Sequence, residues 1–403
     1  MMVMIKEKIE AAEAIRGIAC LFVVFSHLSL TFFPSMHRFF DEQTTTTNFE
    51  LMMHHSPFAF WYSGTAAVYI FFVLSGYVLT YTIVNSRDPI KKIQAMSIKR
   101  YPRLMLPALA SCILLWAAFS FYQPPMQHIS SWGQEIGHVP HIFDQGITAF
   151  LFGDIHQYGA LWTRSIALLS SFIAAGFDGS IRSFFMGYSD YNWVLWTMRI
   201  ELLGSFGLFL LLYLRVKNPK FAWLIPIATI ALCLNVDYLG YAAFLIGALF
   251  YFHKKKLATV PAWICLLLGL YFAGVHNTSA SYQIFYSVLG EQTYEILNFL
   301  AGPLIVIAIM WNTKLADTFS NRLTIFLGKI SFAAYLNHLL ILYLIGLPLF
   351  HFLFGLHWGY ALSAVTSCLT VVGLTLAFSE VFYRIVDKNT MKFSGKISDK
   401  LIK

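Results

Sequence analysis

The sequence predicts an all-α polytopic membrane protein with about ten transmembrane helices. Of its 403 residues, 58% are hydrophobic and only 12% are charged, whereas soluble domains carry about 25% charged residues. Long apolar runs alternate with short basic connections, which is the pattern of a chain that crosses a membrane repeatedly. The formal net charge of +8 comes from these connections and forms no single patch, so we expect no nucleic-acid partner.

A spanning helix needs about 20 mostly apolar residues. The segments that approach this requirement are 13–33, 64–84, 103–122, 191–214, 221–236, 238–253, 258–275, 294–311, 326–347 and 359–383. The fifth and sixth are short, and the Asn-Val-Asp break between them predicts a tight turn. We expect one transmembrane domain over residues 1–390 and a basic cytoplasmic tail over 391–403.

The distribution of basic residues predicts how the chain is oriented. All but four of the 28 lysines and arginines fall in connections on the same side as the two termini. The exceptions are Arg38, Arg164, Arg182 and Arg199. Because cytoplasmic connections collect Lys and Arg, we expect both termini in the cytoplasm.

The opposite side carries a long insertion at about 123–190 that we expect to shape an acceptor site. Its apolar pieces, 147–153 and 160–177, are interrupted by Gly, Asp and Arg. They predict interfacial or re-entrant segments. An extra pair of spans there would leave the orientation unchanged.

Arg16 and His27 are the most informative residues of the first predicted helix. Eleven residues make almost three helical turns, so the two side chains share one face about 16 Å apart. Ionisable groups within an apolar helix are costly and usually functional. A neutral imidazole can act as a general base toward an alcohol or accept an acyl group itself, so we predict His27 to be catalytic.

A basic cluster, Lys99, Arg100 and Arg103, precedes the third predicted span. Arginine suits phosphate because its planar fork makes paired hydrogen bonds. With Arg16 at the same membrane surface, these cations predict an anionic-ligand site for a nucleotide or coenzyme A. Ordinary flanking charge is the alternative interpretation.

Glu201 is predicted about 12 Å into the fourth span from the outer side. His27 lies at a similar predicted depth, so we expect Glu201 to orient His27 or to bind an acceptor hydroxyl. An internal ion pair with Arg199 is the alternative, although residues two apart do not face each other on a helix.

Three further residues are candidates for substrate binding. His338 is predicted in mid-membrane with Tyr335 one turn before it, and Ser75 forms a small pair with Gly76 where helices can approach closely. The five cysteines and the remaining histidines show no metal-ligand spacing, and we expect no metal. His54, His55 and the histidines at 128, 138, 141 and 156 are predicted to be solvated loop residues.

These motifs, in this order, resemble the acyltransferase-3 family of integral membrane proteins, which O-acylate carbohydrates and other hydroxyl acceptors. The similar elements are Arg16-x10-His27, Phe-Phe-Val-Leu-Ser75-Gly, Lys99-Arg100-x-x-Arg103, Trp196-x4-Glu201 and Ser-x3-Tyr335-Leu-x-His338. Together they cover about residues 9–385. No single motif is specific, but their order and placement are.

The resemblance implies a ten-helix acyltransferase core that takes an acyl-CoA donor, typically acetyl-CoA, from the cytoplasm. It implies that His27 is the base or acyl carrier and that Arg16, Arg100 and Arg103 serve the donor. We therefore expect transfer of an acetyl or short acyl group to a lipid-linked glycan or surface polysaccharide, within membrane lipid. Buried ionisable groups also suit a transporter or flippase of an anionic lipid-linked sugar. A non-catalytic subunit of a polysaccharide assembly complex is a third possibility.

Overall fold

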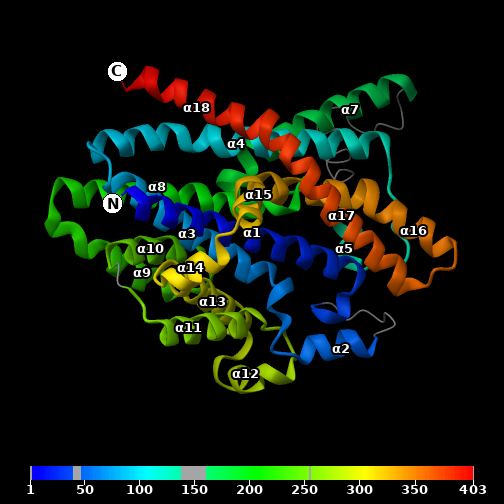
Figure 1. The fold of residues 1–403 in the computed structure, drawn as a ribbon. Coiled ribbons are helices and arrows are strands. Elements are labelled where there is room, and N and C mark those ends of the chain that lie inside the picture. Colours follow the sequence, from blue (N-terminus) through cyan, green and yellow to red (C-terminus); the bar gives the residue numbers. More distant parts are fainter. Residues whose placement is uncertain (1, 40–46, 138–159, 254–255, 403) are drawn as a thin grey trace. The chain divides into compact units, whose positions relative to one another are not determined.

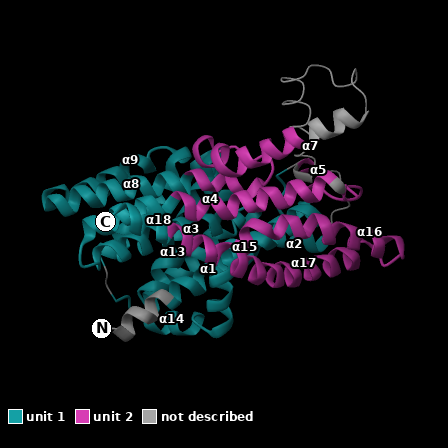
Figure 2. Ribbon diagram, turned by 90° about the horizontal axis from the view of Figure 1, so that it is seen from above, with its two compact units in different colours: residues 1–100, 200–332, 395–403 teal, residues 101–199, 333–394 magenta. Residues whose placement is uncertain are grey.

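The computed structural model describes residues 2–39, 47–137, 160–253 and 256–402, and all regular elements in these ranges are helices (Figure 1). The predicted apolar piece at 147–153 lies outside them. The chain divides into two compact units (Figure 2). Unit 1 comprises residues 1–100, 200–332 and 395–403, and unit 2 comprises residues 101–199 and 333–394.

Unit 1 contains most of the helices. They are α1 (Met2–Phe32), α2 (Asn48–His55), α3 (Gly64–Val84), the start of α4 (Pro89–Phe121), most of α8 (Thr197–Lys217), α9 (Leu224–Cys233), α10 (Leu239–Phe252), α11 (Thr259–Ala273), α12 (Gln283–Leu289), α13 (Thr293–Met310), α14 (Thr313–Phe319), the first half of α15 (Arg322–Ile341) and the end of α18 (Lys388–Leu401). Short 3-10 turns connect several of them, among them η1 (Pro34–Met36) and η2 (Ala59–Tyr62).

Unit 2 contains the rest of α4 and the second half of α15. Its other helices are α5 (Ser131–Gly137), α7 (Ala160–Phe177), α16 (Leu347–Gly355) and α17 (Tyr360–Phe382), and the first half of α18. Wider π-helical turns follow α7 (Asp178–Met186), join α15 to α16 (Leu342–Gly346) and join α17 to α18 (Tyr383–Asp387). A 3-10 turn, η5 (Trp193–Trp196), precedes α8.

Every predicted span coincides with a helix, but not every such helix is long enough to cross a membrane. Among the described residues, 7 helices have the length and apolar composition of membrane spans. The three apolar helices at Pro219–Cys233, Val236–Phe252 and Thr259–Ala273 are shorter. They correspond to the fifth, sixth and seventh predicted spans. The described part of the chain is therefore all-helical, and its long apolar helices are those of a membrane protein.

Close crossing of glycines holds α3 against α10. A Cβ atom added at Gly76 would lie 1.9 Å from the carbonyl oxygen of Phe244, and one added at Gly247 would lie 2.0 Å from that of Val73. No side chain fits at either position. Small residues let membrane helices approach until their backbones touch, so the predicted structural role of the Ser-Gly pair in α3 is confirmed at Gly76.

Glycines also bring α1 into close contact with the first half of α15. A Cβ at Gly17 would lie 2.6 Å from the carbonyl oxygen of Thr324, and one at Gly328 would lie 2.0 Å from that of Glu13. The middle of α1, around Arg16, is therefore held against the first half of α15.

Two regions differ from the sequence-based expectation. α4 begins at Pro89 rather than near residue 103, so the basic cluster lies within a 33-residue helix instead of preceding it. The segment predicted as a tail is the end of α18, where Ser398 donates a hydrogen bond to the carbonyl of Ala95 at 3.3 Å. In both regions, the charged residues on one face of an amphipathic helix have the composition of a solvated connection, and for this reason the sequence did not indicate a helix there.

Candidate active site

His27 and Arg16 lie on one unbroken helix, as the sequence predicts. The step of eleven residues from one to the other separates the two Cα atoms by about 16 Å along the axis of α1. Both side chains are partly exposed. Nη1 of Arg16 donates to Oε1 of Glu13 at 3.1 Å, so a carboxylate already accompanies this charge.

Ser26, the residue before His27, shows which part of α3 lies beside this region of α1. A Cβ at Gly64, the first residue of α3, would lie 2.9 Å from Oγ of Ser26. The helices therefore touch at the N-terminal end of α3, and His27 belongs to that end of unit 1.

Three more histidines gather beside the end of α1. The ring centroids of His37 and His276 are 5.1 Å apart, and those of His54 and His276 are 6.1 Å apart. The ring of Tyr62 packs on both His37 and His276, with centroids 5.0 Å away in each case. We call His27, His37, His54 and His276 the histidine cluster.

Hydrogen bonds fix these rings. Nε2 of His37 pairs with Oγ of Ser29 on α1 at 2.8 Å. Nδ1 of His54 lies 3.1 Å from the carbonyl oxygen of Met36, and Nδ1 of His276 lies 3.0 Å from a carbonyl two residues before it. Because a carbonyl only accepts, Nδ1 carries the proton in His54 and His276.

The cluster keeps its buried members neutral. Burial lowers the pKa of His54 and of His276 from 6.5 to about 4. Burial, followed by the charges of His276, His27 and His54, lowers the pKa of His37 well below its ordinary value. If His27 accepts a proton near neutral pH, the neighbouring rings of His37, His54 and His276 are therefore uncharged.

One expectation about these residues is wrong. His54 is not a solvated loop residue but is fully buried in α2, where its ring is held between the carbonyl of Met36 and the hydroxyl of Thr278. His55 and His128 are exposed, as expected. The histidines at 138, 141 and 156 lie outside the described residues. Within the described ranges, no three His, Cys, Asp or Glu side chains are placed to hold a metal ion.

Glu201 has partners that the sequence did not indicate. Its Oε1 accepts hydrogen bonds from Nη2 of Arg100 and, at 2.8 Å, from Oγ of Ser75. Nε of Arg100 donates to Oγ of Ser205, one turn further along α8, at 2.8 Å. The guanidinium and the carboxylate are largely buried. We call Ser75, Arg100, Glu201 and Ser205 the ion-pair cluster.

The predicted pairing of Glu201 with His27 is not what the structure shows. Glu201 contacts α3 at Ser75, whereas Ser26, the residue before His27, lies beside Gly64, eleven residues earlier on the same helix. That difference corresponds to about 16 Å along α3. Arg100 is likewise not at a helix entrance, because it lies eleven residues into α4. The alternative partner Arg199 is exposed and makes no ion pair with a described carboxylate.

The other two cations of the basic cluster, Lys99 and Arg103, lie one turn apart on α4. Nζ of Lys99 lies 3.7 Å from Oδ1 of Asp399 on α18, at an exposed position. Arg103 is exposed and belongs to unit 2.

The predicted substrate residues of α15 lie in unit 2. The hydroxyl of Tyr335 donates to the carbonyl of Val194 at 2.8 Å and lies 2.9 Å from Oγ1 of Thr197. His338 is buried, with Nδ1 3.0 Å from the carbonyl of Ala334 one turn before it. These bonds tie α15 to η5 and the start of α8.

The histidines that gather around His27 are what the sequence analysis missed. His37 and His54 lie in a polar connection and His276 lies more than 200 residues further on, so no spacing rule links them. The only available signal was their position, since all three flank predicted spans on the side that holds the end of α1.

Comparison with known proteins agrees with the motifs. A family model described as an acyltransferase domain, Acyl_transf_3, matches residues 9–380, which includes both units. No curated protein and no solved structure matches the chain. The chain therefore belongs to the acyltransferase-3 family and is a membrane enzyme that transfers acyl groups to oxygen.

Proposed function

We propose that this enzyme moves an acetyl or short acyl group from acyl-CoA to a hydroxyl of a carbohydrate. The acceptor in this proposal is a lipid-linked glycan or surface polysaccharide, and the enzyme lies in a bacterial inner membrane with both termini in the cytoplasm. The observation that carries the proposal is the single helix that bears Arg16 near its middle and His27 near its C-terminal end, beside neutral histidines.

His27 supplies the chemistry that this transfer requires. Its imidazole takes the proton of the acceptor hydroxyl while that oxygen attacks the thioester carbonyl carbon. The tetrahedral intermediate then expels the CoA thiolate, which receives the proton from the imidazolium, and an ester and a free thiol result. In the covalent alternative, the imidazole nitrogen attacks first and passes the acyl group to the hydroxyl in a second step.

The remaining residues have supporting roles in this proposal. Arg16, Lys99, Arg100 and Arg103 supply positive charge to the phosphates of the donor. Glu201 acts as a positioning residue, because it bonds Arg100 and Ser75 rather than His27. His338 and Tyr335 are proposed to contact the acceptor.

The family assignment favours this proposal over its alternatives. A carrier or a non-catalytic subunit would use the same buried ionisable groups, but the chain belongs to a family of enzymes. Release of free thiol from acetyl-CoA distinguishes the proposed enzyme from a carrier and from a non-catalytic subunit, because neither of these breaks a thioester.

The test uses purified protein, acetyl-CoA and a panel of glycan acceptors, with thiol release and acylated product both measured. We expect His27→Ala to abolish both. The matched control is His128→Asn, which removes an exposed histidine at a left-handed position that asparagine tolerates. Transfer by His27→Ala at the unaltered rate would disprove the proposed role of His27.

A further inference from the structure

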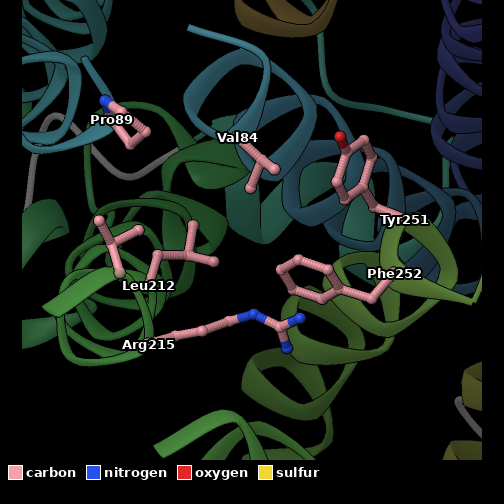
Figure 3. A pocket seen from close by; sticks show the side chains of 7 residues that line it. Val84, Pro89, Leu212, Arg215, Tyr251 and Phe252 are labelled. Carbon is pink, nitrogen blue, oxygen red and sulfur yellow. The ribbon is translucent and has the colours of Figure 1, made fainter. Parts of the chain in front are cut away.

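A pocket in unit 1 lies where the ends of four helices meet. Its volume is about 400 Å³, and it is lined by Val84, Pro89, Leu212, Arg215, Val216, Tyr251 and Phe252 (Figure 3). These residues are the last of α3, the first of α4, the last turns of α8 and the end of α10. The walls therefore belong to helices rather than loops, and the volume is in the range of about 300–1,000 Å³ typical of small-molecule sites.

One charged group faces this pocket. The guanidinium carbon of Arg215 lies 3.6 Å from the centroid of the Phe252 ring, and Figure 3 shows it reaching toward that ring. A cation–π contact uses the face of the guanidinium and leaves the N–H groups along its edge to donate. Arg215 is thus preorganised to bind an anion through its edge.

Arg215 differs in its partners from the three predicted donor-site cations of unit 1. Arg16, Lys99 and Arg100 each lie beside a carboxylate. In the part of the chain that the structure describes, Arg215 has no carboxylate within ion-pair distance. A partly buried cation without a countercharge attracts an anion.

The rest of the lining suits a ring. Val84, Leu212 and Val216 supply apolar walls, and Phe252 and Tyr251 supply aromatic ones. The hydroxyl of Tyr251 accepts a hydrogen bond from Nδ2 of Asn85 at 2.9 Å, which fixes the Tyr251 ring. Aromatic rings and arginine planes are the surfaces on which nucleobases stack.

We propose that this pocket binds the adenine nucleotide end of the acyl-CoA donor, with a phosphate on Arg215 and the base against the aromatic and aliphatic walls. The inference rests on the proposed function, because it assigns the donor a site at the end of the bundle where the basic connection 215–220 lies. A phosphate could also come from an anionic membrane lipid, and the experiment distinguishes these two sources.

The primary measurement is binding of adenosine 3′,5′-bisphosphate to purified full-length protein in phosphatidylcholine nanodiscs. We expect the wild type to bind and Arg215→Gln to bind about tenfold more weakly, because a charge-assisted bond to phosphate is lost. Phe252→Leu should also weaken binding, since it keeps apolar bulk but removes the ring. Lys220→Gln is the matched control, because it removes an exposed charge from the same connection and should leave binding unchanged.

Three results would overturn the proposal. Binding that Arg215→Gln does not weaken places the nucleotide elsewhere. An equal loss with Lys220→Gln shows only general attraction to positive charge. Arg215-dependent binding of phosphatidylglycerol, without binding of the bisphosphate, assigns the pocket to lipid.

Kinetic measurements distinguish a failure of this inference from a failure of the proposed function. With acetyl-CoA, Arg215→Gln should raise KM and leave kcat unchanged, whereas with S-acetylpantetheine, which lacks the nucleotide, neither constant should change. A wild type that transfers from neither donor refutes the proposed function, and the binding arm still decides what the pocket holds. Equal KM increases with both donors would contradict the pocket assignment.

Discussion

At the scale of single residues, the ion pair between Arg100 and Glu201 changes what Glu201 is expected to do. A carboxylate bonded to a buried guanidinium is not available to orient His27 at a different level of α3. Buried ion pairs often add little net stability, but breaking one by removing a single partner costs about 3–5 kcal/mol. Glu201 therefore matters because it compensates the charge of Arg100.

Removing Glu201 alone should destabilise the protein more than removing both partners. We expect Glu201→Leu to lower the melting temperature in detergent strongly, because it leaves Arg100 uncompensated. The Arg100→Met, Glu201→Leu double variant should recover much of the loss without recovering the acyl-transfer rate.

The exposed pair between Lys99 and Asp399 provides a control for this measurement. Asp399→Asn should change the melting temperature little, because exposed pairs contribute little. Equal destabilisation by Glu201→Leu and the double variant would show that charge compensation is not the role of Glu201.

His276 should make the stability of the protein depend on pH. Its pKa is lowered from 6.5 in the unfolded chain to about 4 in the folded protein, so the unfolded state binds more protons between these values. The contribution of neutral His276 to the free energy of unfolding is complete above about pH 6.5 and is lost as the pH is lowered toward 4. At pH 4, protonation of this residue alone lowers the free energy of unfolding by about 3 kcal/mol.

The measurement is the melting temperature between pH 4 and pH 7 for the wild type and His276→Gln. We expect the variant to lose less stability on acidification, because it has no ring to protonate. Asp178 has its pKa raised by burial to about 7 and contributes with the opposite sign, so the difference between the two proteins is the relevant quantity. Parallel curves would contradict the neutral, buried state of His276.

The identity of the candidate residues was easier to predict than their partners. Arg16 and His27 share one helix, so their spacing alone predicted their geometry. The partners of Glu201 lie on α3 and α4, and those of His27 in connections far along the chain. Contacts of this kind follow from tertiary packing, which single-helix periodicity does not contain.

At the scale of elements, the ends of helices were predictable where a polar residue caps the helix. The predicted span 64–84 has the observed bounds of α3, where Ser63 caps the first turn and Asn85 ends the last. The start of α4 was missed because its first turns carry Lys91, Lys92 and Lys99, which resemble a basic connection. Charge density identifies the edge of the apolar region and not the end of the helix.

The crossing of α3 and α10 depends on the absence of a side chain at Gly76. We expect Gly76→Ala to lower the yield of folded protein and its melting temperature, because the added carbon would meet the backbone of Phe244 at 1.9 Å. Fluorescence-detected gel filtration with a heating step measures both.

Gly207 is the matched control for this substitution. It lies within α8 with nothing within 4 Å of an added Cβ. Gly207→Ala should leave stability unchanged or raise it by up to about 1 kcal/mol, since alanine favours the helix. Similar behaviour of the two variants would contradict the close contact of α3 and α10.

At the scale of the whole molecule, the two units divide the candidate residues. Unit 1 holds the histidine cluster, the ion-pair cluster and the pocket beside Arg215, while unit 2 holds Tyr335 and His338. The family model runs through both units, so both belong to the acyltransferase domain.

The most direct test of the central claim is mass spectrometry of cell-surface glycans from cells that express the wild type or His27→Ala at equal levels. If His27 is the base or acyl carrier of an O-acyltransferase, acyl groups on the glycan should be present with the wild type and absent with the variant. They should remain with His128→Asn. Glycans that carry the same acyl groups with His27→Ala as with the wild type would contradict the claim.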